Sequence, residues 1–311
     1  MISNQNNSKK LSYAECIDIS KKVRWDIDND LIKGRTFDVT KKFLPDGLSK
    51  VDQFEFLTDR EKMLLSQVQG WTYANMFGFV ERFIVAKVLE LTAMHWLGDQ
   101  VALESMVRFC DEELKHQELF RRIDQMMADV MPDGYRFLFD PNEVAKAVLS
   151  KSTWAVMALI LEIELFTREH YKQSIEPDNE LSDLYKDVFL FHWKEETTHA
   201  MIDELEWPLV DAKLTPEKRD NAVTDVIDLV TDVDGILKAQ SESDTKYFLK
   251  IIDRQLSEDQ VMQIGKGVHQ AYQWQYIFSG VQHPRFVSML SSLTTEEQRT
   301  RLGDALSLLG K

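Results

Sequence analysis

Residues 58–97 contain no proline, and apolar side chains recur there at every third or fourth position. This spacing matches the turn of an α-helix, and the run stops at Gly98 and Asp99, which are typical turn residues. We therefore expect one long helix over this stretch. The same pattern returns further along the chain, so the fold must accommodate several long helices.

Three further long helices are expected, over residues 101–130, 140–174 and 181–207. The first of them ends at the turn that contains Pro132 and Gly134. The last ends at Pro208, because proline cannot continue a helix without breaking its hydrogen bonds. Four long helices joined by short breaks favour an antiparallel bundle.

Helix-start signals support this reading of the chain. Asp140 is expected as an N-cap, with Pro141 in the first turn and Glu143 closing a capping box. Two further capping boxes begin at Ser257 and at Thr294. The region after the bundle is therefore expected to be helical as well.

The segments before and after the four long helices are also expected to be mainly helical. We expect disorder over residues 1–10, a helix over 11–33, a turn over 42–47 and another helix over 215–237. No alternation with a period of two is long enough to predict a strand. The fold class is therefore all-α.

The composition excludes several classes of partner. The 311 residues are 44% hydrophobic and carry a net charge of −15, which argues against nucleic acid and anionic lipid as partners. The two cysteines, Cys16 and Cys110, form no disulfide framework, which fits a reducing cytoplasm. The polar N-terminus predicts no secretory signal, and no run approaches the ~20 apolar residues of a membrane span.

The candidate chemistry lies on the second and fourth long helices. His192, Glu196 and His199 are spaced by four and three residues, so a helix places them on one face. Glu113 and His116 repeat the Glu-x-x-His spacing on the second helix. Two imidazoles with nearby carboxylates are a set of metal ligands.

A two-metal site in a four-helix bundle needs one glutamate from each of the other two helices. Glu81 lies on an apolar face of the first helix, where an unpaired carboxylate would be costly. On the third helix, periodicity leaves Glu162 and Glu164 open and slightly favours Glu162, whose face neighbours are more apolar. Four carboxylates and two imidazoles suit iron or manganese and leave positions open for dioxygen.

With this order of residues, the stretch 71–207 resembles the ferritin-like diiron-carboxylate superfamily. His192, followed by Glu196 and His199, looks like the p-aminobenzoate N-oxygenase type, which has an extra histidine ligand one turn before its second Glu-x-x-His. The spacing in that family favours Glu164 over Glu162. The resemblance implies these metal ligands: Glu81, Glu113, His116, Glu164, His192, Glu196 and His199.

The resemblance also implies a fold and a function. The fold would be a ferritin-like four-helix bundle with additional N- and C-terminal helices. It comprises an N-terminal extension packing on the bundle over 1–57, the diiron bundle over 58–210 and a C-terminal helical region over 211–311. Thr167, one turn after Glu164, would lie beside the oxygen pocket.

The implied protein is a cytoplasmic non-haem diiron oxidase or oxygenase that uses dioxygen on a small organic substrate, with N-oxygenation of an amine as the candidate reaction. It would hold two iron ions, or manganese and iron, and a homodimer is left open. No flavin, nicotinamide or iron–sulfur motif is recognisable, so an external electron donor is expected. The alternatives are a ferritin-like metal-binding or ferroxidase protein without organic substrate, and a metal-free helical interaction protein.

The neighbours of these residues have structural interpretations. His192 could instead be a core histidine bonded to a backbone carbonyl. Asp203 could accept the free ring N–H of His199 or be solvated. Glu112 and Glu195 are expected to face away, since adjacent helical residues differ by about 100°. No role is assigned to the four remaining histidines, which are His95, His170, His269 and His283. Acidic runs, such as Asp225, Asp228, Asp232 and Asp234, are expected to be solvated helix faces.

Overall fold

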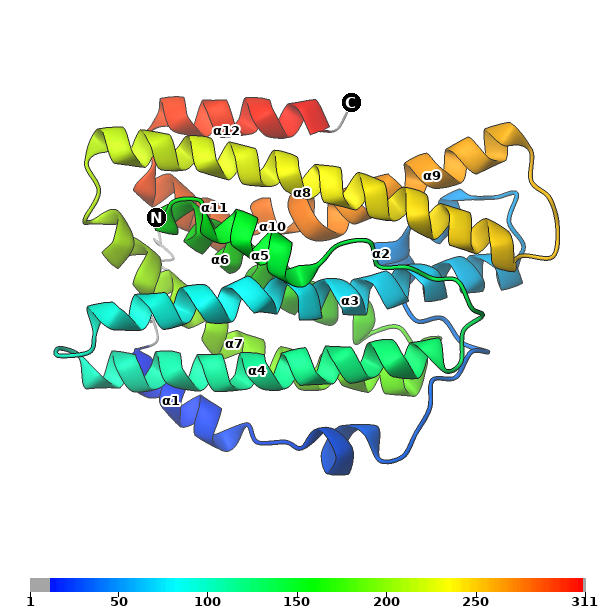
Figure 1. The fold of residues 1–311 in the computed structure, drawn as a ribbon, viewed down its shortest axis with the longest axis horizontal. Helices are drawn as coiled ribbons and strands as arrows, with labels where there is room; N and C mark the ends of the chain where they lie inside the picture. Colours follow the sequence, from blue (N-terminus) through cyan, green and yellow to red (C-terminus); the bar gives the residue numbers. More distant parts are fainter. Residues whose placement is uncertain (1–11, 310–311) are drawn as a thin grey trace, which may run out of the picture.

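The computed structural model describes residues 12–309, and these fold into helices throughout (Figure 1). The expected disorder of residues 1–10 lies outside the described part of the chain. Strand-like pairing within residues 12–309 is limited to one isolated bridge between Lys42 and Leu181. The all-α expectation is confirmed. The helices are α1 Tyr13–Lys22, α2 Asp46–Ser49, α3 Asp59–Leu91, α4 Gln100–Ala128, α5 Pro141–Leu149, α6 Thr153–His170, α7 Asp183–Asp211, α8 Pro216–Ile251, α9 Glu258–Gln273, α10 Ser279–Val281, α11 Pro284–Leu293 and α12 Glu296–Leu309.

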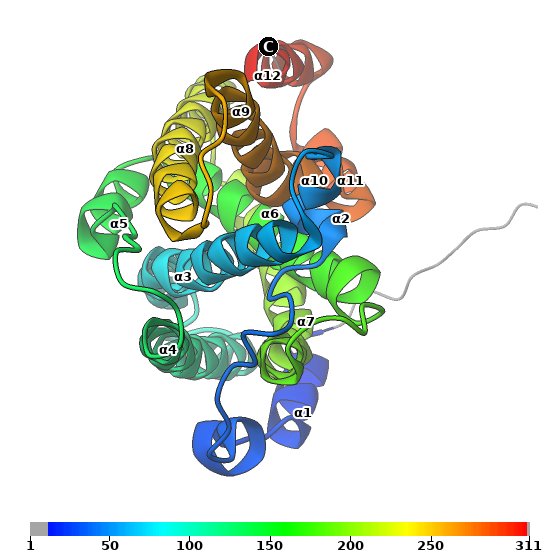
Figure 2. The ribbon, with the colours of Figure 1, turned by 90° about the vertical axis from the view of Figure 1, so that its right-hand side faces the viewer.

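Four long helices form the centre of the fold. Helix α3 packs against α4, α6 packs against α7, and the two pairs meet where α4 contacts α7 and α3 contacts α6. In the view along the bundle, α8, α9 and α12 lie on one side of these four helices and α1 lies on the other (Figure 2). One face of each long helix is therefore turned toward a shared interior.

The third long helix is broken, which the sequence reading did not anticipate. Helix α5 ends at Leu149 and α6 begins at Thr153. Side chains of α8 stabilise the break, because Asp225 accepts the backbone N–H of Ser152 at 2.9 Å and Asp228 pairs with Lys151 at 2.7 Å. The expectation that Asp225 is solvated is therefore wrong, whereas Asp228 is exposed as expected and pairs with Lys151 at the surface.

Other helix ends also differ from the expectation. Helix α7 continues through Pro208 to Asp211, and the burial of Trp207 and Val210 stabilises this extra turn despite the hydrogen bond that proline removes. Helix α3 stops at Leu91, where the hydroxyl of Thr92 donates to the Leu89 carbonyl at 2.7 Å and competes with the backbone.

The flanking segments show further differences. The helix expected over 11–33 is α1 followed by a separate π-helical turn, Ile27–Ile32, which Asp26 caps. Helix α8 runs past the expected end at residue 237 to Ile251. Asp140 does cap α5 by accepting two backbone N–H groups, and Ser257 forms the expected box, whereas the last box begins at Thr295 instead of Thr294.

The C-terminal helices and the bundle share one hydrophobic core within the described residues. A buried polar contact fixes their relative position: Asp244 of α8 accepts hydrogen bonds from Thr72 of α3, at 2.6 Å, and from Tyr272 of α9. Helices α8 and α9 therefore form the wall on one side of α3 and α6.

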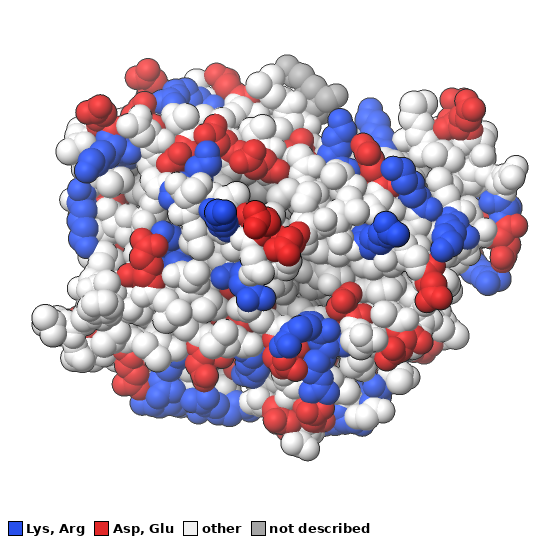
Figure 3. All heavy atoms as spheres, viewed as in Figure 1, with Lys and Arg blue, Asp and Glu red and all other residues white. Residues whose placement is uncertain are grey.

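The surface shown in Figure 3 carries acidic and basic side chains that are interspersed along the helices. None of the described helices combines the length and the apolar character that crossing a membrane requires.

Several of the acidic groups are paired, such as Asp234, whose carboxylate lies 3.0 Å from Nε2 of His269. The expectation that this run of aspartates is only solvated is therefore wrong for Asp234 too.

Candidate metal centre

The seven side chains predicted as ligands lie together in the interior that α3, α4, α6 and α7 share. Each of them is at most 2% exposed. Helix α3 contributes Glu81, α6 contributes Glu164, and α4 and α7 contribute the remaining five. Two groups of side chains could each hold a metal ion, because their donor atoms lie within 4.8 Å of one another: Glu113, His116, Glu196 and His199, and Glu81, His116 and His192.

The first group gathers around His199. Its Nδ1 atom lies 2.9 Å from Glu113, 3.5 Å from Glu196 and 3.8 Å from Glu164. With metal–ligand bonds of about 2.0–2.2 Å, neighbouring donor atoms of an octahedral ion are about 3 Å apart. The spacing of these donors is therefore compatible with one ion.

The second group gathers around His192 and His116. Nε2 of His192 lies 3.2 Å from Glu81 and 3.0 Å from Glu196, and Nδ1 of His116 lies 3.3 Å from Glu196. The two oxygens of Glu196 point to different groups, because Oε1 faces His192 and His116 whereas Oε2 faces His199. Glu196 therefore lies between the two groups of donors and faces both.

His192 does not hydrogen-bond a backbone carbonyl, which was the alternative reading of this residue. Its Nε2 faces two carboxylates, and its Nδ1 has no hydrogen-bond partner within the described residues. The rings of Phe77 and Phe120 meet it edge-on, with centroids 5.1 and 5.0 Å away. His192 therefore belongs to the cluster, and its direct bond to a metal stays a prediction.

The third-helix glutamates point in different directions. Glu164 faces His199 and Glu196 inside the cluster. The carboxyl of Glu162 lies against the backbone of Gly280 in α10 and lines a cavity on the other side of α6. The family spacing that favoured Glu164 agrees with this geometry, and the slight preference of periodicity for Glu162 does not.

A second set of carboxylates orients the histidines. Glu195 accepts from Nε2 of His116 at 2.8 Å, and Glu112 accepts from Nε2 of His199 at 3.0 Å. Glu195 is itself bonded by Lys115 at 2.5 Å. Hydrogen bonds of this kind fix the ring and its tautomer and leave the other nitrogen free for a metal.

The expectation that Glu112 and Glu195 face away is thus wrong, because both are buried and each reaches a histidine of the neighbouring helix. The side chains of Glu112 and Glu195 do point in another direction than those of Glu113 and Glu196, because adjacent helical positions differ. This direction nevertheless places them in the α4–α7 interface. The sequence did carry a signal: both helices contain Glu-Glu-x-x-His, not only Glu-x-x-His.

Several polar atoms of the cluster have no hydrogen-bond partner within the described residues. Buried polar groups are nearly always paired, so a group of unpaired donors and acceptors that face one another needs an explanation. Metal ions bound between these groups would satisfy the atoms that face the interior of the cluster. The residues therefore fit a metal centre, and the atoms are Glu81 Oε2, Glu113 Oε2, His116 Nδ1, Glu164 Oε2, Glu196 Oε1 and His199 Nδ1.

Burial and the close approach of carboxyls and imidazoles raise the pKa values of several groups in the cluster. Burial alone would lower the pKa of His116, but the carboxylates of Glu113 and Glu195 raise it to about 10. Burial raises the pKa of Glu81 to about 8 against the opposing effect of His192. Burial and the neighbouring Glu196 raise the pKa of Glu164 well above its usual range.

Two other expected site residues lie close to the cluster. Thr167 is buried, and its hydroxyl donates to the backbone carbonyl of Ile163 at 2.8 Å; its place beside an oxygen pocket stays a prediction. Asp203 is buried and not solvated, but the ring N–H of His199 goes to Glu112 instead. Burial raises the pKa of the Asp203 carboxyl well above its usual range.

The four histidines without an assigned role make contacts outside the cluster. His95 lies 2.9 Å from Glu206, and His269 pairs with Asp234. His170 is buried between Tyr73 and Ser279, and burial lowers its pKa to about 3. His283 caps α11 by accepting the backbone N–H of Arg285. These contacts account for all four as structural residues.

Aromatic rings and the N-terminal segment surround the cluster. Phe109 stacks on His199 with a centroid distance of 3.9 Å, and Trp25 stacks beside His116 at 6.3 Å. Ser20 of α1 donates to Glu112 at 2.6 Å. The site is therefore closed by apolar rings and by residues that precede the bundle.

Comparison with protein-family models, with curated proteins and with solved structures finds no match to this chain.

Proposed function

We propose that this protein is a non-haem diiron enzyme of the ferritin-like type, which uses dioxygen to oxidise a small organic substrate. N-oxygenation of an amine is the candidate reaction. The observation that carries the proposal is the set of seven buried side chains, from four helices, that face one another, six of which have an unpartnered nitrogen or oxygen atom in the cluster. Their order along α3, α4, α6 and α7 is Glu, Glu-x-x-His, Glu, Glu-x-x-His.

Two iron ions held here, or manganese and iron, would supply the redox chemistry that activates dioxygen. The protein supplies the geometry of the donors. Glu195 and Glu112 hold the Nε2 atoms of His116 and His199, so that the Nδ1 atom of each ring faces the centre. Glu196 spans the two groups of donors through its two oxygens.

The surroundings protect this chemistry from water. Phe77, Phe109 and Phe120 are at most 2% exposed and touch the rings of His192 and His199. Glu81 and Glu164, whose pKa values burial raises, hold protons that must leave when a cation binds. Electrons are expected from an external donor, because the chain has no recognisable motif for an electron-carrying cofactor.

The first test is metal analysis of the purified protein after anaerobic loading with ferrous iron. We expect roughly two ions per chain, with Glu196→Ala retaining neither and His269→Ala retaining both as the matched control. An iron content near zero in the unmodified protein would overturn the metal centre.

The second test measures dioxygen consumption by the loaded protein with a chemical reductant and a panel of small aromatic and aliphatic amines. We expect consumption that depends on an amine and yields an oxygenated nitrogen product. If iron alone consumes dioxygen and no organic substrate increases the rate, the protein is instead a ferroxidase.

A further inference from the structure

Another buried carboxyl with an unpartnered oxygen lies on the opposite side of α6 from the metal centre. Glu162 is 4% exposed, and its Oε1 has no hydrogen-bond partner within the described residues. It lies so close to the backbone of Gly280 that a Cβ atom there would overlap the carboxyl. Leaving a buried carboxyl unpaired is costly, and glycine at position 280 makes the room that this one occupies.

Glu162 lines a narrow cavity of about 40 Å³ between α6 and α8. A larger cavity of about 460 Å³ adjoins it, bounded by α3, α5, α6 and α8. The two have wall residues in common, which are Leu159, Leu229, Val233 and Tyr276. We call the two together the α6–α8 cavity; the larger part has the size of a small-molecule site.

The wall of the α6–α8 cavity is almost wholly apolar. Its polar side chains are Glu162 and Tyr276, whose hydroxyl also has no partner within residues 12–309, and Asp232. Asp232 and Ala147 are exposed, so the larger part of the cavity reaches solvent between α5 and α8. Glu162 is buried and lines the narrower part.

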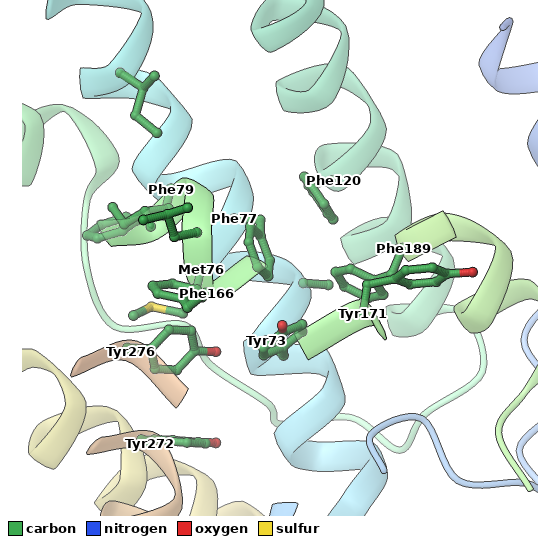
Figure 4. Packing of buried hydrophobic residues seen from close by; sticks show 14 of the residues in the cluster. Tyr73, Met76, Phe77, Phe79, Phe120, Phe166, Tyr171, Phe189, Tyr272 and Tyr276 are labelled. Atoms are coloured by element: carbon green, nitrogen blue, oxygen red, sulfur yellow. The ribbon is translucent and has the colours of Figure 1, made fainter. Parts of the chain in front are cut away.

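The α6–α8 cavity is separate from the metal centre. None of the seven candidate metal ligands lines it. Phe166 lies in its wall and contacts Phe77 at 6.4 Å between centroids, and Phe77 in turn meets His192. Figure 4 shows Phe79, Met76 and Phe166 on one side of Phe77 and Phe120 on the other. Two aromatic rings therefore stand between the cavity and the cluster.

We propose that the α6–α8 cavity binds a small apolar amine, whose nitrogen donates hydrogen bonds to Glu162 and whose hydrocarbon part fills the larger space between α3, α5, α6 and α8. Burial raises the pKa of the Glu162 carboxyl well above its usual range. An amine is a strong base and can take the proton from this carboxyl, and the ammonium group then donates hydrogen bonds to the carboxylate oxygens and carries the complementary charge. The apolar wall takes up the hydrocarbon by the hydrophobic effect. This site does not depend on the metal centre or on its proposed activity.

Isothermal titration calorimetry with n-octylamine, 1-octanol and octanoate tests this site, in both metal-free and iron-loaded protein. We expect n-octylamine to bind at least about tenfold more tightly than the other two probes, with equal affinity in both forms of the protein. Equal affinity for the amine and the alcohol would overturn the role of Glu162. No binding of any probe would show that the cavity holds water only, which would also overturn the proposal.

Three variants complete the experiment. Glu162→Gln should weaken n-octylamine binding at least about tenfold and leave the bound metal unchanged, whereas Glu143→Gln, an exposed change of the same charge on α5, should leave both unchanged. Ala147→Phe fills the mouth from an exposed position and should abolish binding with Glu162 intact. If Glu196→Ala abolished n-octylamine binding and Ala147→Phe did not, the amine would bind at the metal centre and the separate site would be disproved.

Discussion

Glu195 of α7 accepts a hydrogen bond from Nε2 of His116 on α4, over 2.8 Å. The reverse pair, Glu112 of α4 with His199 of α7, has the same form at 3.0 Å. The two helices thus exchange carboxylates, and each imidazole is held by the helix opposite its own. The α4–α7 interface and the geometry of the metal centre therefore depend on the same contacts.

Removing these carboxylate contacts should weaken the positioning of the His116 and His199 rings, while every candidate metal ligand stays in place. Glu195→Gln and Glu112→Gln should each lower the affinity for ferrous iron about 10–100-fold, measured by competition with a chelator. Glu104→Gln, an exposed change on α4, is the control. An affinity unchanged in both buried variants would show that the histidines are positioned by packing alone.

The two donor groups should lose metal in different ways. His192 lies only in the group with Glu81 and His116, so His192→Ala should reduce the iron content from roughly two ions to roughly one per chain. Glu196 faces both groups, so Glu196→Ala should remove both ions. Elemental analysis of anaerobically loaded samples distinguishes these outcomes, and equal losses in the two variants would contradict the position of Glu196 between the two groups of donors.

The stability difference between loaded and metal-free protein should grow with pH. In the metal-free form the raised pKa of His116, about 10, gives stability that is complete below about 6.5 and is lost as the pH rises toward 10. The raised pKa of Glu81, about 8, likewise contributes stability to the metal-free form that is complete below about 4.5 and is lost as the pH rises toward 8. Metal binding needs these groups deprotonated, so it strengthens over the same range.

Thermal unfolding of both forms between pH 6 and 9 measures this difference. Groups outside the cluster, such as Asp244, affect both forms alike and cancel. The variant His116→Gln should flatten the pH dependence of the metal-free form. A constant gap between the two melting temperatures would contradict the raised pKa values described for the cluster.

Adding a single methyl group to α3 at Gly70 should disturb its contact with the N-terminal segment and lower the stability of the fold. A Cβ atom on Gly70 would lie 2.6 Å from Cβ of Phe43 and 3.3 Å from the backbone nitrogen of Leu44. Gly70→Ala should therefore lower the free energy of unfolding by about 1–3 kcal/mol. Gly303→Ala in α12 meets nothing within 4 Å and should be neutral or stabilising by up to about 1 kcal/mol in the same denaturant titration.

The long helices and the residues of the cluster could be predicted because both depend on local spacing. Glu113, His116, Glu196 and His199 share a helix face by their positions alone, and Glu81 was marked by its apolar neighbours. Contacts between helices have no such local signal. Spacing alone predicts that Glu112 and Glu195 point in another direction than Glu113 and Glu196. It does not predict which histidines they contact, because those histidines lie on another helix.

The breaks in the helices were hard to predict for a related reason. Ser152 is the N-cap of α6, and Asp225, far along the chain, accepts its backbone N–H. Pro208 stays inside α7 because Trp207 and Val210 are buried by neighbouring helices. In both places tertiary contacts outweigh the local preference of the residues.

The position of α1 sets an order of events during synthesis. Ser20 and Trp25 close one side of the cluster, and α1 rests on both α4 and α7. Helix α7 leaves the ribosome long after α1, so α1 has no complete surface to dock on until most of the chain is made. Until that moment His116 of α4 is not covered by α1 and α7, so an ion could reach it before the site is closed. Filling of the candidate centre during translation would then need no later opening of the folded protein.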